Sequence, residues 1–403
     1  MSGFFRALRN NIRQQRPPKR HISGATQIIP ADTLIEEETL PHYQPAHYYS
    51  VNIGDVYLSR YKIAGKLGYG AYSTSWLCQD LRANNKYIVL KVSTCLPDFP
   101  TATERELRIY EHLSKIESSH PGQALIRGMY YSFDMHSTGG KHQCLVLQPM
   151  QMRVLEMLGT NPKPFDMPLL KMTVRRLLLV LDFLHTEAGV IHADLKTDNL
   201  MLSLEDDDML GDFATSEAED PSPRKPINES RIIYKSRKFR RPRESKGYGL
   251  PVLCDFGEAR IGDRQESGPF VIFEMPWGSP VDIWNLGALV WDLFEGEQLF
   301  GDIFNARGRH DAFKHLALTV ALIGPRSSEF VRRSETTEQC FDSGGAWIAH
   351  EEEPIPKISL EMLEKRLGRE EKTLFLAFIK SMLMWIPEER HTAKQLLKHP
   401  FLL

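Results

Sequence analysis

The fold of this chain is decided by residues 191–200, which read IHADLKTDNL. They follow a stretch that is apolar around most of a helix, residues 168–186, and they lead into a short apolar stretch typical of a strand. Asp194, Lys196 and Asn199 place a base, a cation and a metal ligand in one loop. Transfer of a phosphoryl group from a nucleotide to a hydroxyl needs this combination. Each residue alone would fit a polar surface turn equally well.

A second carboxylate and a glycine-rich turn accompany this loop. Residues 253–257, LCDFG, read as a short strand that ends in Asp255. Upstream, LGYGAYSTSW at residues 67–76 reads as a turn between two strands, and its glycines would let backbone N–H groups approach phosphates closely. Ser73 occupies the position of a third glycine, so an ordinary hairpin turn is the alternative for this stretch alone. Together and in this order, the motifs favour a phosphotransferase.

A lysine lies near the end of an apolar strand predicted at residues 87–92. Lys91 is flanked there by aliphatic residues, and a buried ammonium needs a counter-charge such as a carboxylate or a phosphate. On the helix predicted at residues 101–114, Glu106 is the natural candidate and Glu104 competes with it. A lysine of an edge strand, without a function, is the other interpretation.

Composition limits the class of protein. The chain has 403 residues, 42% of them hydrophobic and 25% charged, which can form a sizeable core and excludes a disordered or collagen-like chain. A net charge of −2 gives no reason to expect binding to nucleic acid or to a membrane surface. The sequence contains no run of about 18 apolar residues, which is the length that a helix needs to span a bilayer. Scattered cysteines predict reduced thiols in an intracellular protein of the cytoplasm or nucleus; they are Cys78, Cys95, Cys144, Cys254 and Cys340.

Charge and periodicity divide the chain into regions. Residues 1–42 are expected to be a basic, disordered tail, with mitochondrial targeting as the alternative, because no acidic residue precedes Asp32. Residues 43–149 are β-rich and residues 150–403 mainly helical, which predicts an α+β protein with a small β lobe and a large helical lobe. Within the large lobe, residues 203–250 carry an acidic block and then a basic block without sustained periodicity, so we expect a disordered insert.

The ordered motifs resemble those of the eukaryotic protein kinases over about residues 61–403. Residues 281–287, VDIWNLG, resemble the kinase helix whose aspartate (Asp282) braces the catalytic loop, and Arg390 resembles the arginine near the end of the large lobe. A narrower resemblance is to the SR-protein kinases, in a fungal branch. Three stretches carry it: residues 43–61, which lead into the first predicted strands; EGEQLF at residues 295–300; and the charged segment 203–250, which divides the kinase core. This resemblance implies the two-lobed protein kinase fold with ATP and Mg²⁺ as cofactors.

The resemblance also implies roles for the loop residues. Asp194 would orient or deprotonate the acceptor serine hydroxyl, and Lys196 would neutralise the γ-phosphate. Asn199 and Asp255 would hold Mg²⁺.

A nucleotide site is implied in the same way. Lys91, paired with Glu106, would contact the phosphates beneath the glycine-rich turn. The adenine would lie against the hinge, with hydrogen bonds from the carbonyl of Gln148 and the amide of Met150. The implied nucleotide-binding residues are Leu67, Gly68, Gly70, Ser73, Ser75, Lys91, Glu106, Gln148 and Met150.

Two departures from the kinase pattern affect regulation and substrate docking. Ala193 stands where an arginine normally gathers a phosphorylated activation loop, so activity without that phosphorylation is implied, as in the SR-protein kinases. Between Asp255 and Asp282 the chain is roughly ten residues shorter than the resemblance implies, and no Ala-Pro-Glu anchor is recognisable. Arg390 would then lack its usual partner, for which Glu274 is a candidate.

The predicted function is that of an ATP-dependent serine/threonine protein kinase acting on Arg/Ser-rich, splicing-factor-like proteins. The shortened segment motivates the alternative of a catalytically impaired kinase or an ATP-binding pseudokinase. A nucleic-acid binder that uses the basic residues 235–246 is a third interpretation, disfavoured because an adjacent acidic block could neutralise them. We expect a protein substrate as partner, no direct nucleic acid, no membrane span and a monomer.

Overall fold

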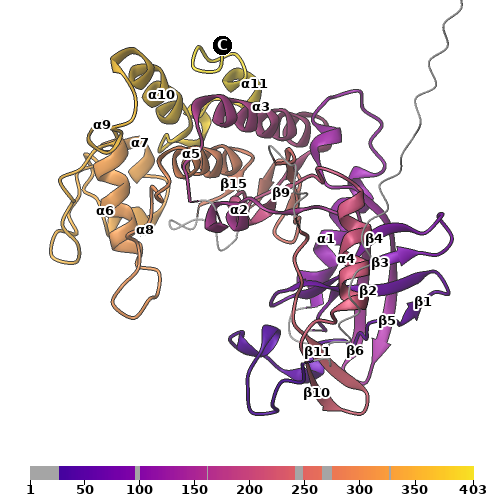
Figure 1. The fold of residues 1–403 in the computed structure, drawn as a ribbon. Coiled ribbons are helices and arrows are strands. Elements are labelled where there is room, and N and C mark those ends of the chain that lie inside the picture. Colours follow the sequence, from indigo (N-terminus) through magenta and orange to yellow (C-terminus); the bar gives the residue numbers. More distant parts are fainter. Residues whose placement is uncertain (1–26, 96–99, 161, 241–247, 266–274, 326–327) are drawn as a thin grey trace, which may run out of the picture.

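The computed structural model describes residues 27–95, 100–160, 162–240, 248–265, 275–325 and 328–403. Its small lobe contains an antiparallel sheet with the strand order β1-β2-β3-β4-β6-β5 (Figure 1). Cross-strand register aligns Trp76, Leu90 and Val146 in one buried row, and such pairs stabilise the sheet. The strands and the helix beside them are β1 (Val56–Tyr57), β2 (Tyr61–Tyr69), β3 (Ser73–Asp80), β4 (Lys86–Ser93), α1 (Pro100–Leu113), β5 (Met129–Ser137) and β6 (Gly140–Leu147).

The large lobe is built around three helices, α3 (Met167–Phe183), α5 (Pro280–Glu295) and α10 (Arg369–Met382) (Figure 1). A Cβ atom at Gly287 would lie 2.9 Å from Leu383, so glycine lets α5 approach the end of α10 closely. Other helices are α2 (Val154–Thr160), α6 (Ala312–Ile323), α7 (Ser328–Val331), α8 (Glu335–Glu338), α9 (Leu360–Leu363) and α11 (Ala393–Leu396). Short strands are β7 (Met152–Arg153), β8 (Val190–Ile191), β9 (Leu200–Leu202), β12 (Pro251–Leu253), β13 (Arg260–Ile261), β14 (Arg264–Gln265) and β15 (Trp277–Gly278).

Helix α3 is the buried helix predicted at residues 168–186, with shifted ends. It begins after Asp166, whose carboxylate accepts a hydrogen bond from the Leu169 amide at 2.9 Å. Its last predicted residues form a wider π-helical turn that ends at Gly189, which has a φ of 58°. A left-handed residue of this kind commonly ends a helix. None of the described helices is both long and apolar enough to cross a membrane.

The expectation of a disordered insert at residues 203–250 is wrong for most of that segment. It contains α4 (Asp208–Glu219) and a hairpin of β10 (Arg224–Asn228) and β11 (Arg231–Tyr234), and α4 lies against β2 (Figure 1). Phe213 of α4 fits so closely over β2 that a Cβ atom at Gly65 would lie 2.7 Å from its ring. Asp208, Asp212 and Glu219 of α4 are exposed and masked a short apolar face in the sequence. Glu217 of the same helix is buried and pairs with Arg237. Residues 241–247 lie outside the described residues.

The predicted tail boundary at residue 42 is also wrong, because residues 27–42 belong to the small lobe. Ile29 and Ile35 are buried together with Ile233 of β11. Two buried lysines bring acidic residues of the same segment onto the lobe: Lys66 of β2 pairs with Glu37, and Lys225 of β10 pairs with Glu38 at 2.9 Å. Residues 1–26, on which the tail and targeting predictions mainly depend, lie outside the described residues.

Candidate active site

The loop that carries the deciding motif is held from below by Asp282 of α5. This carboxylate is fully buried and accepts hydrogen bonds from the amides of His192, at 2.9 Å, and Ala193, at 2.7 Å. His185 contacts it at 2.8 Å. Burial alone would raise the pKa of Asp282, but the hydrogen bonds from His185 and the His192 amide lower it below its ordinary value. The anchored loop keeps Ala193 at a φ of 63°, a left-handed conformation that costs a non-glycine residue free energy.

Asp194 lies at the centre of the three predicted loop residues. The Asn199 side-chain amide donates to the Asp194 carboxylate and to its backbone carbonyl, both at 2.8 Å. Lys196 approaches the same carboxylate at 2.9 Å. The carboxylate retains 29% of its side-chain exposure, so it is oriented yet accessible. Since the nitrogen of the Asn199 amide is used inward, its oxygen is free to coordinate a cation.

The second cluster joins the two lobes through Lys91. Its ammonium lies 2.6 Å from Glu106 of α1 and 3.5 Å from Asp255. Glu104, the competing candidate, pairs with Arg108 instead. Register places Ser75 of β3 directly beside Lys91. Lys91, Glu106 and Asp255 therefore form one ion-paired group between strand, helix and the LCDFG stretch.

Charge in this group favours the binding of a cation and of phosphate. The positive charge of Lys91, with help from the Gly257 amide, lowers the pKa of Asp255 to about 2, so this carboxylate is ionised at neutral pH. Burial acts to lower the pKa of Lys91, but the carboxylates of Asp255 and Glu106 hold it above its ordinary value. Asp255 remains half exposed. An ionised carboxylate oxygen together with the amide oxygen of Asn199 is a donor set that suits Mg²⁺.

Phe256 fixes the position of Asp255. Its ring is fully buried between Tyr110 of α1, at a centroid distance of 5.4 Å, and His192, at 5.2 Å. This stack connects the helix that carries Glu106 to the loop that carries Asp194. Asp255 itself has a φ of 62°, a strained conformation that the packed phenylalanine next to it maintains.

The glycine-rich turn connects β2 to β3 above this group. The amide of Gly70 donates to the carbonyl of Ser73 at 2.8 Å, and the Tyr48 hydroxyl donates to the carbonyl of Gly70 at 3.0 Å. A Cβ atom at Gly68 would meet no atom within 4 Å. That open space beside the backbone is where a phosphate could approach. Leu67, at the end of β2, is partly buried against the core.

The hinge at residues 147–150 departs in one respect from the prediction. Met150 is buried with Cys254 and lies beside Met201 of β9, which forms an apolar floor for a base. The Gln148 carbonyl, predicted to face the adenine, accepts a hydrogen bond from Arg127 Nε at 2.9 Å. The protein therefore already uses one lone pair of the predicted acceptor.

The segment after Gly257 is tied to α1 by a residue that the sequence analysis did not single out. Arg105 Nη1 donates to the Gly257 carbonyl at 3.0 Å and to the Glu258 carboxylate at 2.9 Å. Further on, β14 and β15 pair and close the base of the segment. Residues 266–274, which include Glu274, the candidate partner of Arg390, lie outside the described residues.

Arg390 is held by backbone carbonyls and by an aromatic ring. Its guanidinium donates to the carbonyls of Pro280 and Met384, both at 2.9 Å, and lies 4.9 Å from the ring centre of Trp284. Burial lowers its pKa to about 10. Within the described residues no carboxylate lies in salt-bridge distance of Arg390. Backbone carbonyls and an aromatic ring thus contact the guanidinium, and Glu274, the candidate partner, lies outside the described residues.

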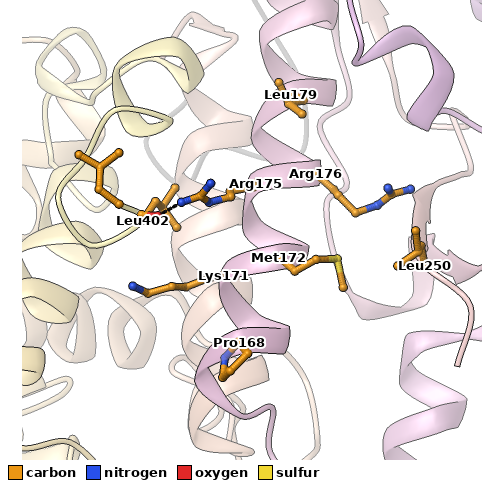
Figure 2. Close-up of a pocket in the computed structure, with 9 residues that line it drawn as sticks. Pro168, Lys171, Met172, Arg175, Arg176, Leu179, Leu250 and Leu402 are labelled. Carbon is orange, nitrogen blue, oxygen red and sulfur yellow. Dashed lines mark hydrogen bonds between the residues drawn. The ribbon is translucent and has the colours of Figure 1, made fainter. Parts of the chain in front are cut away.

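A surface hollow of about 450 Å³ lies elsewhere, between α3 and the end of the chain (Figure 2). Two of its basic side chains already donate hydrogen bonds to the protein backbone. Arg175 donates to the Leu402 carbonyl, and Arg176 donates to the Pro251 carbonyl at 3.0 Å. None of the predicted site residues lines it. The predicted site residues therefore lie apart from this hollow.

Arg105 and Arg127 are the site residues that sequence reasoning missed. Neither belongs to a motif, because each acts on a part of the chain that only the fold brings near. The neighbouring Glu106 was a signal for Arg105 only because both lie on α1, from which Glu106 contacts Lys91 and Arg105 contacts Gly257 and Glu258. Nothing in the sequence pointed to Arg127.

Comparisons with known proteins support a protein kinase. The protein kinase domain model matches residues 61–243 and 244–402. A solved crystal structure of a kinase domain covers 89% of this chain and 100% of that domain, with a TM-score of 0.64 and 20% identity, which confirms the two-lobed α+β fold.

The relatives are protein kinases. A serine/threonine protein kinase of Aspergillus fumigatus is 39% identical over 412 residues and covers 100% of both chains. The serine/threonine-protein kinase SRPK of Physarum polycephalum is 28% identical over 91% of both chains. SRSF protein kinase 3 of Mus musculus is 31% identical over 47% of this chain and 35% of its own. The pseudokinase alternative finds no support among them. The chain belongs to the protein kinase family, as an SRPK-like serine/threonine protein kinase.

Proposed function

We propose that this kinase transfers the γ-phosphoryl group of ATP to serine hydroxyls in Arg/Ser-rich proteins. The observation that carries the proposal is the pair of clusters described above. Lys91, Glu106 and Asp255 form the first cluster, and Asp194 with Asn199 forms the second. Phosphoryl transfer depends mainly on positioning and on stabilisation of charge, which these two clusters would supply.

On the nucleotide side, Lys91 would bind the phosphates while Glu106 keeps its ammonium in place. A Mg²⁺ ion held by Asp255 and the Asn199 amide oxygen would neutralise charge on the phosphate oxygens. The glycine-rich turn would cover the phosphates from above, with the open space at Gly68 admitting them, while the Gly70 amide keeps the turn closed on the Ser73 carbonyl.

On the acceptor side, Asp194 would accept a hydrogen bond from the serine hydroxyl and hold its proton as the new bond forms. Lys196, 2.9 Å from that carboxylate, would approach the transferred phosphoryl group. The left-handed backbone of Ala193, fixed by Asp282, would hold the side chains of Asp194 and Lys196 in position.

The substrate class rests on sequence relatives. The relatives named SRPK and SRSF protein kinase 3 support a substrate rich in arginine and serine. The alanine at position 193 supports an enzyme that needs no phosphorylated activation loop, because no arginine is present there to bind the phosphate. The contact from Arg105 to Glu258 would order the segment instead.

A matched pair of substitutions tests the proposal. Asp194→Asn should lower the rate of phosphate transfer to an Arg-Ser repeat peptide by about 10² to 10⁴-fold. Asp134→Asn, the same change on the exposed face of β5, should leave the rate unchanged. Peptides with lysine for arginine, or alanine for serine, measure the substrate preference. Equal transfer to the lysine and arginine peptides would contradict the substrate class, and full activity of the Asp194 variant would contradict the role of that residue.

A further inference from the structure

Arg127 lies between the hinge and the strand that ends in Leu253, where its backbone is fixed. The amide of Arg127 donates to the carbonyl of Leu253 at 3.0 Å, and the residue before it forms a parallel bridge with the same leucine. From this position the side chain extends toward the hinge. Its Nε donates to the Gln148 carbonyl at 2.9 Å, and its Nη1 lies 3.9 Å from the sulfur of Met201.

The hinge carbonyl that Arg127 engages has a fixed direction. The Gln148 amide donates to the Gly128 carbonyl at 2.9 Å, and the Gly128 amide donates back to the Gln148 side chain at 3.3 Å. Since Met201 belongs to the apolar floor beside Met150, the guanidinium lies at the inner end of the space proposed for the base. Its charge also reaches Cys254, whose pKa burial raises to about 12 and Arg127 partly lowers.

This placement changes what the hinge offers to a purine. Adenine presents an N–H donor at its C6 position, which suits a free carbonyl acceptor. Here a permanently charged donor uses one lone pair of the Gln148 carbonyl, so an N–H group that approaches the other lone pair also approaches N–H groups of Arg127. A purine with a carbonyl oxygen at C6 presents an acceptor instead. The guanidinium has five N–H donors, and those not used by Gln148 can donate to that oxygen.

We propose that Arg127 determines the base selectivity of the nucleotide site and lets it accept 6-oxopurine nucleotides, such as GTP, alongside ATP. The inference rests on the proposed function, because it assumes that the nucleotide base lies against the hinge. An uncharged, apolar side chain at position 127 would leave the Gln148 carbonyl open and favour adenine alone. A buried polar contact that only one of two ligands satisfies separates their affinities by about tenfold to a hundredfold.

The test measures binding of the non-hydrolysable Mg²⁺ complexes of AMP-PNP and GMP-PNP by calorimetry, using the full chain. For the unaltered protein we expect dissociation constants within about tenfold of each other. Arg127→Met keeps the length of the side chain and its packing on Met201 but removes the donors. It should bind AMP-PNP more tightly and GMP-PNP more weakly, so that the ratio of the two constants shifts by about tenfold or more toward adenine.

Two further variants complete the design. Arg127→Leu serves if the methionine variant does not fold, as judged from its thermal unfolding without nucleotide. Arg82→Met removes an arginine from an exposed turn of the small lobe, where its hydrogen bond to Leu58 is long, and should leave the ratio unchanged.

The possible results separate the two hypotheses. An unaltered protein that prefers AMP-PNP by more than about a hundredfold, or Arg127 variants with an unchanged ratio, would overturn the role of Arg127 while leaving the kinase function standing. If neither the unaltered protein nor the variants bound either nucleotide, the proposed function itself would fail. If AMP-PNP bound only to the Arg127 variants, Arg127 would block the base site altogether. This result would overturn the proposal that the site accepts GTP.

Discussion

Replacing Glu37 by glutamine should destabilise the small lobe, although Glu37 is far in sequence from the kinase motifs. Lys66, its partner, has only 1% of its side chain exposed, and Glu37 has 7%. Removing one partner of a buried ion pair leaves an uncompensated charge and typically costs about 3–5 kcal/mol. Because Glu36 lies 3.5 Å from the same ammonium, we expect a loss near the lower end, about 3 kcal/mol.

The double substitution of Lys66→Met with Glu37→Met should cost little. It replaces both charged groups by apolar side chains of similar length near Tyr69 and Trp76, and exchanging a whole buried ion pair for apolar volume is often close to neutral. Urea unfolding followed by fluorescence measures both variants. Asp32→Asn, an exposed change in the same segment, is the control and should remain within about 0.5 kcal/mol of the unaltered protein.

The comparison between the two variants decides the outcome. If Glu37→Gln cost less than about 1 kcal/mol, residues 27–42 would not be part of the folded lobe, and our assignment of them would be refuted. If the double variant cost as much as Glu37→Gln, the stabilisation would come from the charge pair itself and not from avoiding an unpaired charge.

Three further outcomes are expected. Arg105→Met should lower the kinase turnover about three- to fivefold and leave ATP binding unchanged in calorimetry, and combining it with Glu258→Gln should add nothing, because both remove one partly exposed bond. Phe213→Ala should cost about 3–5 kcal/mol in urea unfolding, whereas Thr215→Ala on the exposed face of α4 should cost much less. Burial raises the pKa of Asp292 to about 6, so the folded state binds more protons than the unfolded chain and stability falls as pH rises from about 4 to 6. Asp292→Asn keeps the acceptor for the Leu299 amide, and its thermal unfolding should show a weaker fall and higher stability at pH 8 by about 1–3 kcal/mol.

The predicted site residues were recoverable from the sequence because their chemistry is compact. Asp194, Lys196 and Asn199 lie within one loop, so their order along the chain already implies their proximity in space. Lys91 and Glu106 lie on consecutive predicted elements, and a buried lysine must find a carboxylate. Local spacing and the cost of an unpaired charge are therefore sufficient to predict these contacts.

The ordered part of the insert could not be predicted in the same way. Average charge over residues 203–250 resembles that of a disordered segment, but disorder depends on whether apolar surface can be buried. Phe213 finds a complementary surface at Gly65, and Ile233 finds one at Ile29 and Ile35. These surfaces come from distant parts of the chain, so composition within the segment carries no information about them.

Arg105 and Arg127 extend this argument from stability to activity. A motif records residues that meet the nucleotide or the acceptor, and such residues must be alike wherever the reaction is the same. Arg105 and Arg127 instead contact parts of this chain, the carboxylate of Glu258 and the carbonyl of Gln148. Their effect is to set the conditions under which the shared machinery operates: which segment is ordered and which base the hinge accepts. What distinguishes this kinase from others with the same motifs should therefore be sought in contacts of this kind, and the two arginine substitutions measure them directly.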